Sequence, residues 1–134
     1  MAKKVIPAKL ENLEEAINFI KEGARSLGFD DRKISQIQLA SEEVLVNIIN
    51  YAYAGKDGNI EITYTPKNSK ALEIEIVDWG IPFNLLEQPS PDISAPIENR
   101  KIGGLGIYLV RNTMDEVNYK RYEDRNSLTL IKYL

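Results

Sequence analysis

Two neighbouring stretches of alternating apolar and polar residues limit the fold of this chain more than any other feature. Residues 60–65 and 72–76 both alternate in this way, and the segment 66–70 between them holds Pro, Asn and Ser. A short polar segment between two such runs predicts an antiparallel hairpin. The chain therefore has to build a sheet, and its other segments have to pack on it.

Helical periodicity precedes this hairpin. In residues 13–27 the apolar side chains fall on one helical face, and Gly28 is a natural end for that helix. Asp30 or Asp31 can cap a second, longer helix that we expect to run to about Tyr53. The sequence thus predicts two helices before the hairpin.

Further strands are predicted near both ends of the chain. Residues 3–9 have the pattern of a short first strand, and residues 116–123 and 127–133 have the pattern of a final pair. Because helices and hairpins do not alternate as βαβ units, we predict an α+β two-layer sandwich, with helices on one face of a mixed, mostly antiparallel sheet. A chain of 134 residues fits one domain, which we expect to span residues 1–134.

Residues 78–106 are rich in proline and glycine and separate the hairpin from helical periodicity that resumes at Ile107. A loop of this length is uncommon inside a small domain and is typical of a lid or a binding loop. We expect one short helical turn in it, near residues 83–87. The segment is therefore a candidate part of a functional site.

The chain contains no histidine and no cysteine, and this absence removes several kinds of active site. Catalytic arrangements that need His, zinc sites built from Cys and His, and disulfide frameworks are all excluded. Proton transfer near neutral pH falls to carboxylates, Lys, Tyr or metal-bound water. A metal site made of oxygen ligands suits Mg²⁺ better than zinc.

Charge and hydropathy restrict the partners and the compartment. A net charge of −3 makes direct electrostatic binding to nucleic acid unfavourable. No apolar run approaches the roughly 18–20 residues of a membrane span, and the first residues lack the apolar stretch of a secretory signal. We expect a cytoplasmic protein with no membrane partner and no direct nucleic-acid partner.

Glu43 and Asn47 on the second predicted helix form the first candidate site. They lie about 40° apart around the helix axis, and Asn50 lies close to the same line. Spacing alone favours a solvated helix face, although Asn is a mediocre helix former and is less typical of such a face than Lys and Glu pairs. Glu42 points about 140° away from Asn47, which makes it the weaker candidate.

Two more candidate sites follow the hairpin. Asp78 at a strand end can accept a hydrogen bond from an amino group, and Gly80 allows close approach of a ligand or backbone; a plain turn is the alternative. Glycines before the helix at Ile107 expose N–H groups that suit phosphate, with a hinge as the alternative. This glycine-rich stretch is neither a Walker A loop nor a G-x-G-x-x-G motif, and it consists of Gly103, Gly104, Leu105 and Gly106.

Taken in order, these elements resemble the GHKL ATPase superfamily, also called the Bergerat fold, which includes gyrase, MutL and the histidine kinases. The resemblance covers about residues 8–134. The matching parts are the N box at Glu43 and Asn47, the first glycine box at Asp78 and Gly80, the ATP lid at residues 84–102, and the second glycine box at residues 103–106.

Within that superfamily the chain is similar to the anti-sigma-factor serine-protein kinases of bacterial stress response and sporulation. The supporting residues are 41–47, 94–96 and above all 103–117, which end in Met-Asp-Glu-Val. The resemblance implies an ATP-binding anti-sigma factor and serine/threonine protein kinase that phosphorylates a STAS-type anti-sigma-factor antagonist. It also implies ATP and Mg²⁺ as cofactors, a sigma factor as a second partner, and a possible homodimer.

The resemblance implies roles for single residues as well. Asn47 would ligate Mg²⁺, Glu43 would be the general base for an incoming serine hydroxyl, and Arg100 would reach the γ-phosphate from slightly before the position of the family's arginine. Family members often carry His four residues after the metal-binding Asn. This chain has Tyr51 at that position, and we assign it a packing or rim role.

The implied nucleotide contacts lie on both sides of the lid. Asp78 would accept a hydrogen bond from the adenine amino group, Gly80 would make room for the ring, and Thr129 would help to hold Asp78 and the adenine. The other implied nucleotide contacts are Asn50, Gly103, Gly104, Leu105 and Gly106.

Two other functions stay open. A nucleotide-gated regulatory binding module would bind ATP and a partner without phosphotransfer. The ATPase domain of a larger histidine kinase or topoisomerase is less compatible, because the chain has no phosphoacceptor histidine. From the initiating Met and the room for only one domain, we expect the domain to stand alone.

Overall fold

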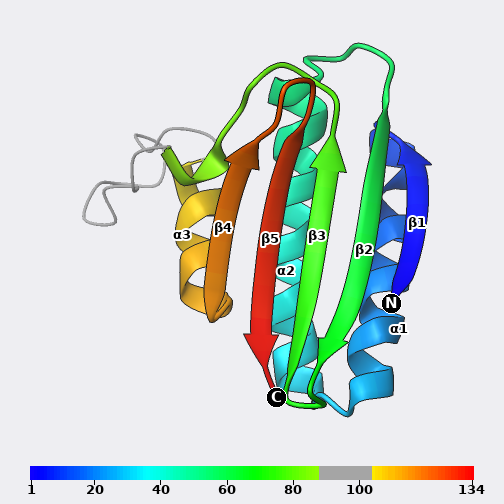
Figure 1. The fold of residues 1–134 in the computed structure, drawn as a ribbon, viewed down its shortest axis with the longest axis vertical. Coiled ribbons are helices and arrows are strands. Elements are labelled where there is room, and N and C mark those ends of the chain that lie inside the picture. Colours follow the sequence, from blue (N-terminus) through cyan, green and yellow to red (C-terminus); the bar gives the residue numbers. More distant parts are fainter. Residues whose placement is uncertain (88–103) are drawn as a thin grey trace.

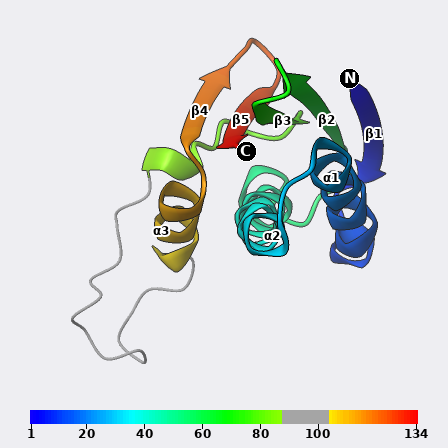
Figure 2. The same ribbon diagram turned by 90° about the horizontal axis from the view of Figure 1, so that it is seen from below.

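The computed structural model describes residues 1–87 and 104–134, which form a sheet covered on one face by helices (Figures 1 and 2). The strands are β1 (Ala2–Pro7), β2 (Asn59–Lys67), β3 (Ala71–Asp78), β4 (Glu116–Arg121) and β5 (Asn126–Tyr133). The helices are α1 (Leu13–Leu27), α2 (Asp31–Asn47) and α3 (Gly104–Thr113), with short turns η1 (Leu10–Asn12), η2 (Ile48–Ala52) and η3 (Leu85–Glu87). The predicted α+β two-layer sandwich is confirmed, and η3 lies where one helical turn was expected.

The five-stranded sheet has the order β1-β2-β3-β5-β4, and its four pairings are all antiparallel. The predicted β2–β3 hairpin is confirmed, and no parallel pairing occurs among the described strands. β3 lies at the centre of the sheet. The register places Asp78, its last residue, opposite Ile60 on β2 and opposite Asn126 on β5.

The helix ends follow the predicted local signals. α1 ends where Gly28 adopts a left-handed φ of 97°, a conformation that glycine reaches without steric cost. Asp30 caps α2, because its carboxylate accepts a 2.8 Å hydrogen bond from the Lys33 backbone N–H. α2 continues directly into the π-helical turn η2, so the second helix reaches Ala52, close to its predicted end.

The core lies between the helices and the sheet, and α2 runs behind β3 and β5 at the middle of the helix layer (Figures 1 and 2). Each fully buried Ile or Leu contributes about 1.5–3 kcal/mol through the hydrophobic effect, so α2 is firmly held there. Core residues with at most 1% exposure include Ile20 on α1, Ile37 and Leu45 on α2, Ile62 on β2, Ile74 on β3 and Leu130 on β5. Within the described ranges, no helix is long and apolar enough to cross a membrane.

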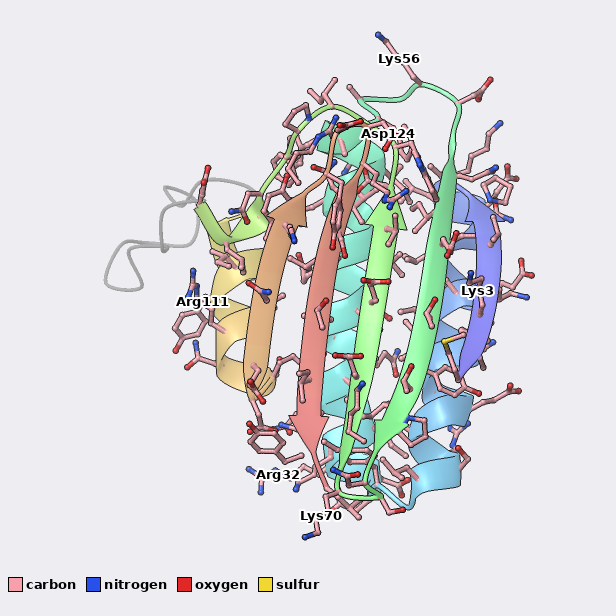
Figure 3. All side chains as sticks on the ribbon, viewed as in Figure 1. Lys3, Arg32, Lys56, Lys70, Arg111 and Asp124 are labelled. Atoms are coloured by element: carbon pink, nitrogen blue, oxygen red, sulfur yellow. The ribbon has the colours of Figure 1, made fainter. Side chains whose placement is uncertain are left out.

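The end of β3 lies very close to η2. The Ile81 N–H donates a 2.9 Å hydrogen bond to the Ala52 carbonyl oxygen, and a Cβ on Gly80 would lie 2.4 Å from the same oxygen. Glycine is therefore required here by the approach of another backbone segment, one of the two reasons predicted for it. In Figure 3 this end of the sheet is the one near Asp124, and Lys70 lies at the opposite end.

Candidate active site

Asp78 is a nearly buried carboxylate at the end of β3, with 2% of its surface exposed. Its Oδ1 accepts hydrogen bonds from the Gly80 N–H at 2.9 Å and from Asn126 Nδ2 at 2.8 Å. Burial raises the pKa of Asp78, although these two hydrogen bonds and the positive charge of Arg121 act in the opposite direction. Arg121 is itself fixed by a 2.9 Å bond to the Gly80 carbonyl. Two hydrogen bonds and one nearby positive charge thus hold the carboxylate in one place.

Asn126, the first residue of β5, connects Asp78 to the segment that follows β3. Besides Asp78, its Nδ2 donates a 2.8 Å bond to the Ile81 carbonyl. Its Oδ1 accepts a 3.2 Å bond from the Phe83 N–H and a bond from the Tyr119 hydroxyl. Sequence reasoning missed this residue, because only the pairing register of β3 and β5 brings it opposite Asp78.

Thr129 was predicted to help hold Asp78, and the structure corrects this prediction. Thr129 pairs with Glu75, three positions along the strand from the Asp78–Asn126 pair. Side chains alternate between the two faces of a strand, so Thr129 and Ser127 point away from the face that carries Asn126. Ser127 confirms that direction, since its hydroxyl donates a 3.0 Å bond to Glu75. Asn126 takes the place predicted for Thr129.

A small cavity joins the end of β3 to α2. Its volume is about 20 Å³, and it is lined by Val44, Asn47, Ile48, Asp78, Phe83, Leu85, Tyr119, Asn126 and Leu128. Small-molecule pockets usually enclose about 300–1,000 Å³, so a ligand of that kind requires some lining side chains to move. Phe83 is one of these lining side chains, and its ring stacks on the ring of Tyr51 with the ring centroids 5.4 Å apart. This contact agrees with the packing role expected for Tyr51.

Glu43 and Asn47 lie one helical turn apart on α2, as predicted. Asn47 is 5% exposed, so the helix face on which it lies is not solvated at this residue. The Asn47 Nδ2 donates a 2.6 Å bond to the Glu43 carbonyl oxygen, which turns the side-chain oxygen Oδ1 away from the helix backbone. Glu43 is half-buried, and burial, followed by the nearby charge of Glu42, raises its pKa.

The start of α3 lies against this pair of residues. A Cβ on Gly106 would be 2.7 Å from the Glu43 carboxylate oxygen Oε2 and 3.5 Å from Asn47 Nδ2. A side chain at this position would therefore displace the Glu43 carboxylate. Gly104 and Leu105 belong to the first turn of α3, where backbone N–H groups have no partner within the helix. The structure thus brings the Glu43 and Asn47 pair close to the glycine-rich stretch at the start of α3.

Several predicted site residues are not placed in this cluster. Gly103 and Arg100 lie outside the described residues, as do residues 88–102 of the predicted lid, so their roles stay predictions. Asn50 is exposed in η2, and no hydrogen bond among the described residues joins it to Glu43 or Asp78. The wider π-helical turn changes the angle that an ideal α-helix predicted for Asn50.

The residues present fit a phosphate-bearing ligand with a hard cation. The first turn of α3 begins at Gly104 and offers backbone N–H groups without a helical partner, and a Cβ on Gly106 would lie 2.7 Å from Glu43 Oε2. The Glu43 and Asn47 side chains offer oxygen ligands of the kind that Mg²⁺ prefers. Within the described residues, no group of three or more His, Cys, Asp or Glu side chains could hold a metal by itself. A Mg²⁺ ion here would therefore need phosphate oxygens and water to complete its shell.

Comparison with known proteins identifies relatives along almost the whole chain. Residues 6–132 match the family described as the histidine kinase-like ATPase domain. Serine-protein kinase RsbW of Bacillus thuringiensis (strain Al Hakam) is 31% identical over 133 residues, which cover 96% of this chain and 82% of that protein. The protein of the same name in Bacillus cereus (strain Q1) has the same identity and coverage.

Solved structures show the same fold at lower identity. The RsbU and RsbW domains of Rv1364c from Mycobacterium tuberculosis align with a TM-score of 0.63 and 14% identity, covering 98% of this chain and 32% of that longer chain. The catalytic domain of histidine kinase ThkA aligns with a TM-score of 0.56 and 16% identity, covering 99% of this chain and 96% of that domain.

Proposed function

Because this chain belongs to the histidine kinase-like ATPase family, we propose that it is an ATP-dependent serine-protein kinase that also acts as an anti-sigma factor. The observation that carries the proposal is the meeting of three motifs. A Cβ on Gly106 would lie 2.7 Å from Glu43 Oε2 and 3.5 Å from Asn47 Nδ2, and Asn47 lines the same cavity as Asp78. We call Asp78, Gly80 and Asn126 the base end of the site, and Glu43, Asn47 and Gly106 the phosphate end.

At the base end, Asp78 would recognise adenine. Its buried carboxylate would accept a hydrogen bond from the exocyclic amino group of adenine. Guanine carries a carbonyl oxygen at that ring position and could not donate this bond. The aromatic and aliphatic side chains that line the cavity, such as Phe83 and Leu85, would pack on the ring after moving aside. This part of the proposal explains why a carboxylate is kept buried despite the cost of removing it from water.

At the phosphate end, Glu43 would act as the general base. It would accept the proton of a partner's serine hydroxyl while the serine oxygen bonds to the γ-phosphorus. The bond between the γ-phosphorus and the β,γ-bridging oxygen breaks at the same time, and ADP leaves. Burial, which raises the pKa of Glu43, makes this carboxylate a stronger base. Asn47 Oδ1 would ligate Mg²⁺, which neutralises phosphate charge when bound. The first N–H groups of α3, at Gly104 and Gly106, would bind phosphate oxygens.

The partners are part of the same proposal. The relatives carry the name serine-protein kinase RsbW. The anti-sigma-factor role that we propose for this chain rests on its resemblance to the anti-sigma-factor serine-protein kinases. We propose a STAS-type anti-sigma-factor antagonist as the phosphoacceptor and a sigma factor as the inhibited partner. We also propose that the protein acts in the cytoplasm and forms a homodimer. Exchange between partners would follow from their different affinities for the ATP-bound and ATP-free protein.

A transfer assay tests the kinase proposal. The purified chain is incubated with Mg²⁺, γ-labelled ATP and a STAS-type anti-sigma-factor antagonist, and label on that antagonist is measured. We expect transfer by the unmodified chain and its loss in Glu43→Ala, with ATP binding largely retained. If the unmodified chain and Glu43→Ala regulate the sigma factor equally well and neither transfers label, the protein is instead a nucleotide-gated binding module.

A further inference from the structure

We propose that Asn126 is a positioning residue that decides which oxygen of Asp78 is offered to the nucleotide base, and thereby sets the preference for ATP over GTP. The inference rests on the proposed function, because it concerns the same site. It adds a residue that neither the motifs nor the position of Thr129 indicated. Its basis is the hydrogen-bond geometry around the end of β3.

The two oxygens of Asp78 have different surroundings. Gly80 N–H and Asn126 Nδ2 both donate to the same oxygen, Oδ1, at 2.9 and 2.8 Å. A carboxylate oxygen has about two lone-pair positions, so these two donors fill Oδ1. Oδ2 is then the oxygen with capacity for another donor, and its direction is set once Oδ1 is fixed. The amino group of a base is such a donor.

The amide of Asn126 has a defined orientation. Its Nδ2 donates to Asp78 and to the Ile81 carbonyl, both at 2.8 Å. Its Oδ1 accepts from the Phe83 N–H at 3.2 Å and from the Tyr119 hydroxyl. A flipped amide would place Oδ1 against two acceptors, the Asp78 carboxylate and the Ile81 carbonyl, and Nδ2 against the Phe83 N–H donor, so three of the four bonds would be lost. The amide nitrogen therefore faces Asp78.

Few side chains can replace Asn126 in this network. It is 3% exposed, and the β3–β5 register places it directly opposite Asp78. An Asp at this position would bring a second negative charge against the Asp78 carboxylate. A Leu of similar size would leave Asp78, Ile81 and Phe83 without their partner, and a Thr would supply one hydroxyl in place of an amide with two donors.

The charge on Asp78 supports the same role. Burial raises its pKa, and the Asn126 bond, the Gly80 bond and Arg121 oppose that rise. The ionisable groups that face Asp78 are Arg121 and Tyr119 on β4 and Tyr53 beside η2. Loss of the Asn126 amide removes one stabilising bond to the ionised carboxylate. Protonated Asp78 would donate from Oδ2 and would favour the oxygen of guanine over the amino group of adenine.

The test is a calorimetric titration of Asn126→Leu and the unmodified chain with Mg-ATP and with Mg-GTP across a pH series. A hydrogen bond to a charged group is worth enough to change an equilibrium by about tenfold to a hundredfold. We expect ATP affinity to fall by about that factor and the ATP:GTP affinity ratio to fall with it. The pH at which half of the ATP affinity is lost should move upward.

Matched variants keep the test decisive. Thr129→Val, on the opposite face of the same strand, should change neither the affinity ratio nor the pH midpoint. Tyr119→Phe removes one donor to Asn126 and should shift both in the same direction as Asn126→Leu but less. If Asn126→Leu does not fold, as judged by thermal unfolding, Asn126→Thr and Tyr119→Phe decide the question by the same two measurements.

The outcomes separate this inference from the function on which it rests. If the unmodified chain binds no ATP, the proposed function is wrong. If it binds ATP, and Asp78→Asn abolishes that binding, the function stands. Unchanged ATP:GTP ratio and pH midpoint in the folded Asn126 variants would then overturn the positioning role alone.

Discussion

The base end and the phosphate end of the site are held in different ways. At the base end, Asp78 and Asn126 lie on paired strands, are 2% and 3% exposed, and share hydrogen bonds with each other and with neighbouring backbone. At the phosphate end, Glu43 is a half-buried side chain on α2, and a Cβ on Gly106 of α3 would lie 2.7 Å from its carboxylate. The base end is thus built into the sheet, and the phosphate end lies between two helices.

The difference indicates which residues serve both stability and function. Hydrogen bonds between buried groups contribute about 0.5–1.5 kcal/mol each, and an orphaned buried group costs about 1–3 kcal/mol. Changes at the base end that remove these hydrogen bonds or add volume should therefore affect folding and nucleotide binding together. Changes at Glu43 or Gly106 should affect phosphate transfer while folding stays nearly intact.

Glu43→Gln should have the largest effect and should act on transfer alone. Removal of a general base typically lowers a rate by about 10²–10⁴-fold, and Gln keeps the size and polarity of the side chain. Because burial disfavours the ionised carboxylate, the variant should be at least as stable as the unmodified chain. Transfer rate and thermal unfolding measure the two expectations, and a lower unfolding temperature would break the proposed division.

Gly80→Ala should destabilise the fold. The new Cβ would lie 2.4 Å from the Ala52 carbonyl oxygen, so two backbone segments would have to separate. Strain of this kind costs about 1–3 kcal/mol, occasionally more. Denaturant unfolding should show the loss, together with weaker ATP binding. Unchanged stability with weaker ATP binding would mean that the glycine serves the nucleotide only.

Gly106→Ala is the matched change at the phosphate end. Here the Cβ would meet the Glu43 carboxylate at 2.7 Å, and a flexible side chain can move where a backbone cannot. Stability should change by less than in Gly80→Ala. Displacement of the base by about 1 Å should lower the transfer rate by roughly tenfold to a hundredfold. Comparable losses of stability in the two glycine variants would erase the contrast between the two ends.

The smallest expected effect is a pH dependence of stability at the base end. Since burial raises the pKa of Asp78 above its ordinary value of 3.8, the folded state binds this proton more tightly than the unfolded chain does. The resulting stabilisation is complete below the unfolded pKa and is lost as pH rises through the folded pKa. Between the unfolded and the folded pKa of Asp78, the free energy of unfolding of Asp78→Asn should therefore rise relative to that of the unmodified chain as the pH increases. Denaturant unfolding of both proteins at several pH values measures this difference.

Local signals in the sequence were sufficient for the elements but not for every contact between them. The β2–β3 alternation, the Asp30 cap and the Gly28 end are each encoded within a few residues, and all three are confirmed. The partner of Asp78 lies 48 residues away on another strand. A sequence pattern does not fix the register between strands so far apart, and an error of an odd number of residues moves a side chain to the other face. The family resemblance implied Thr129, which the register places three positions from the Asp78–Asn126 pair.

The candidate site divides along the same lines. Helical spacing correctly paired Glu43 with Asn47, because both lie on one regular helix. Asn50 lies in the π-helical turn η2, which no residue pattern in the sequence indicated, so its role stays a prediction. The placement of Gly106 against Glu43 depends on how α3 packs on α2, which is a property of the tertiary structure.

The most direct test of the account is calorimetric titration of Mg-ATP into the unmodified chain and into Asp78→Asn, with thermal unfolding of both proteins. In the variant, the amide oxygen can keep the bonds from Gly80 and Asn126, while the amide nitrogen replaces the acceptor offered to adenine. We predict that the unmodified chain binds ATP and that the variant loses this binding without losing stability. Equal ATP binding by both proteins would contradict the proposed site.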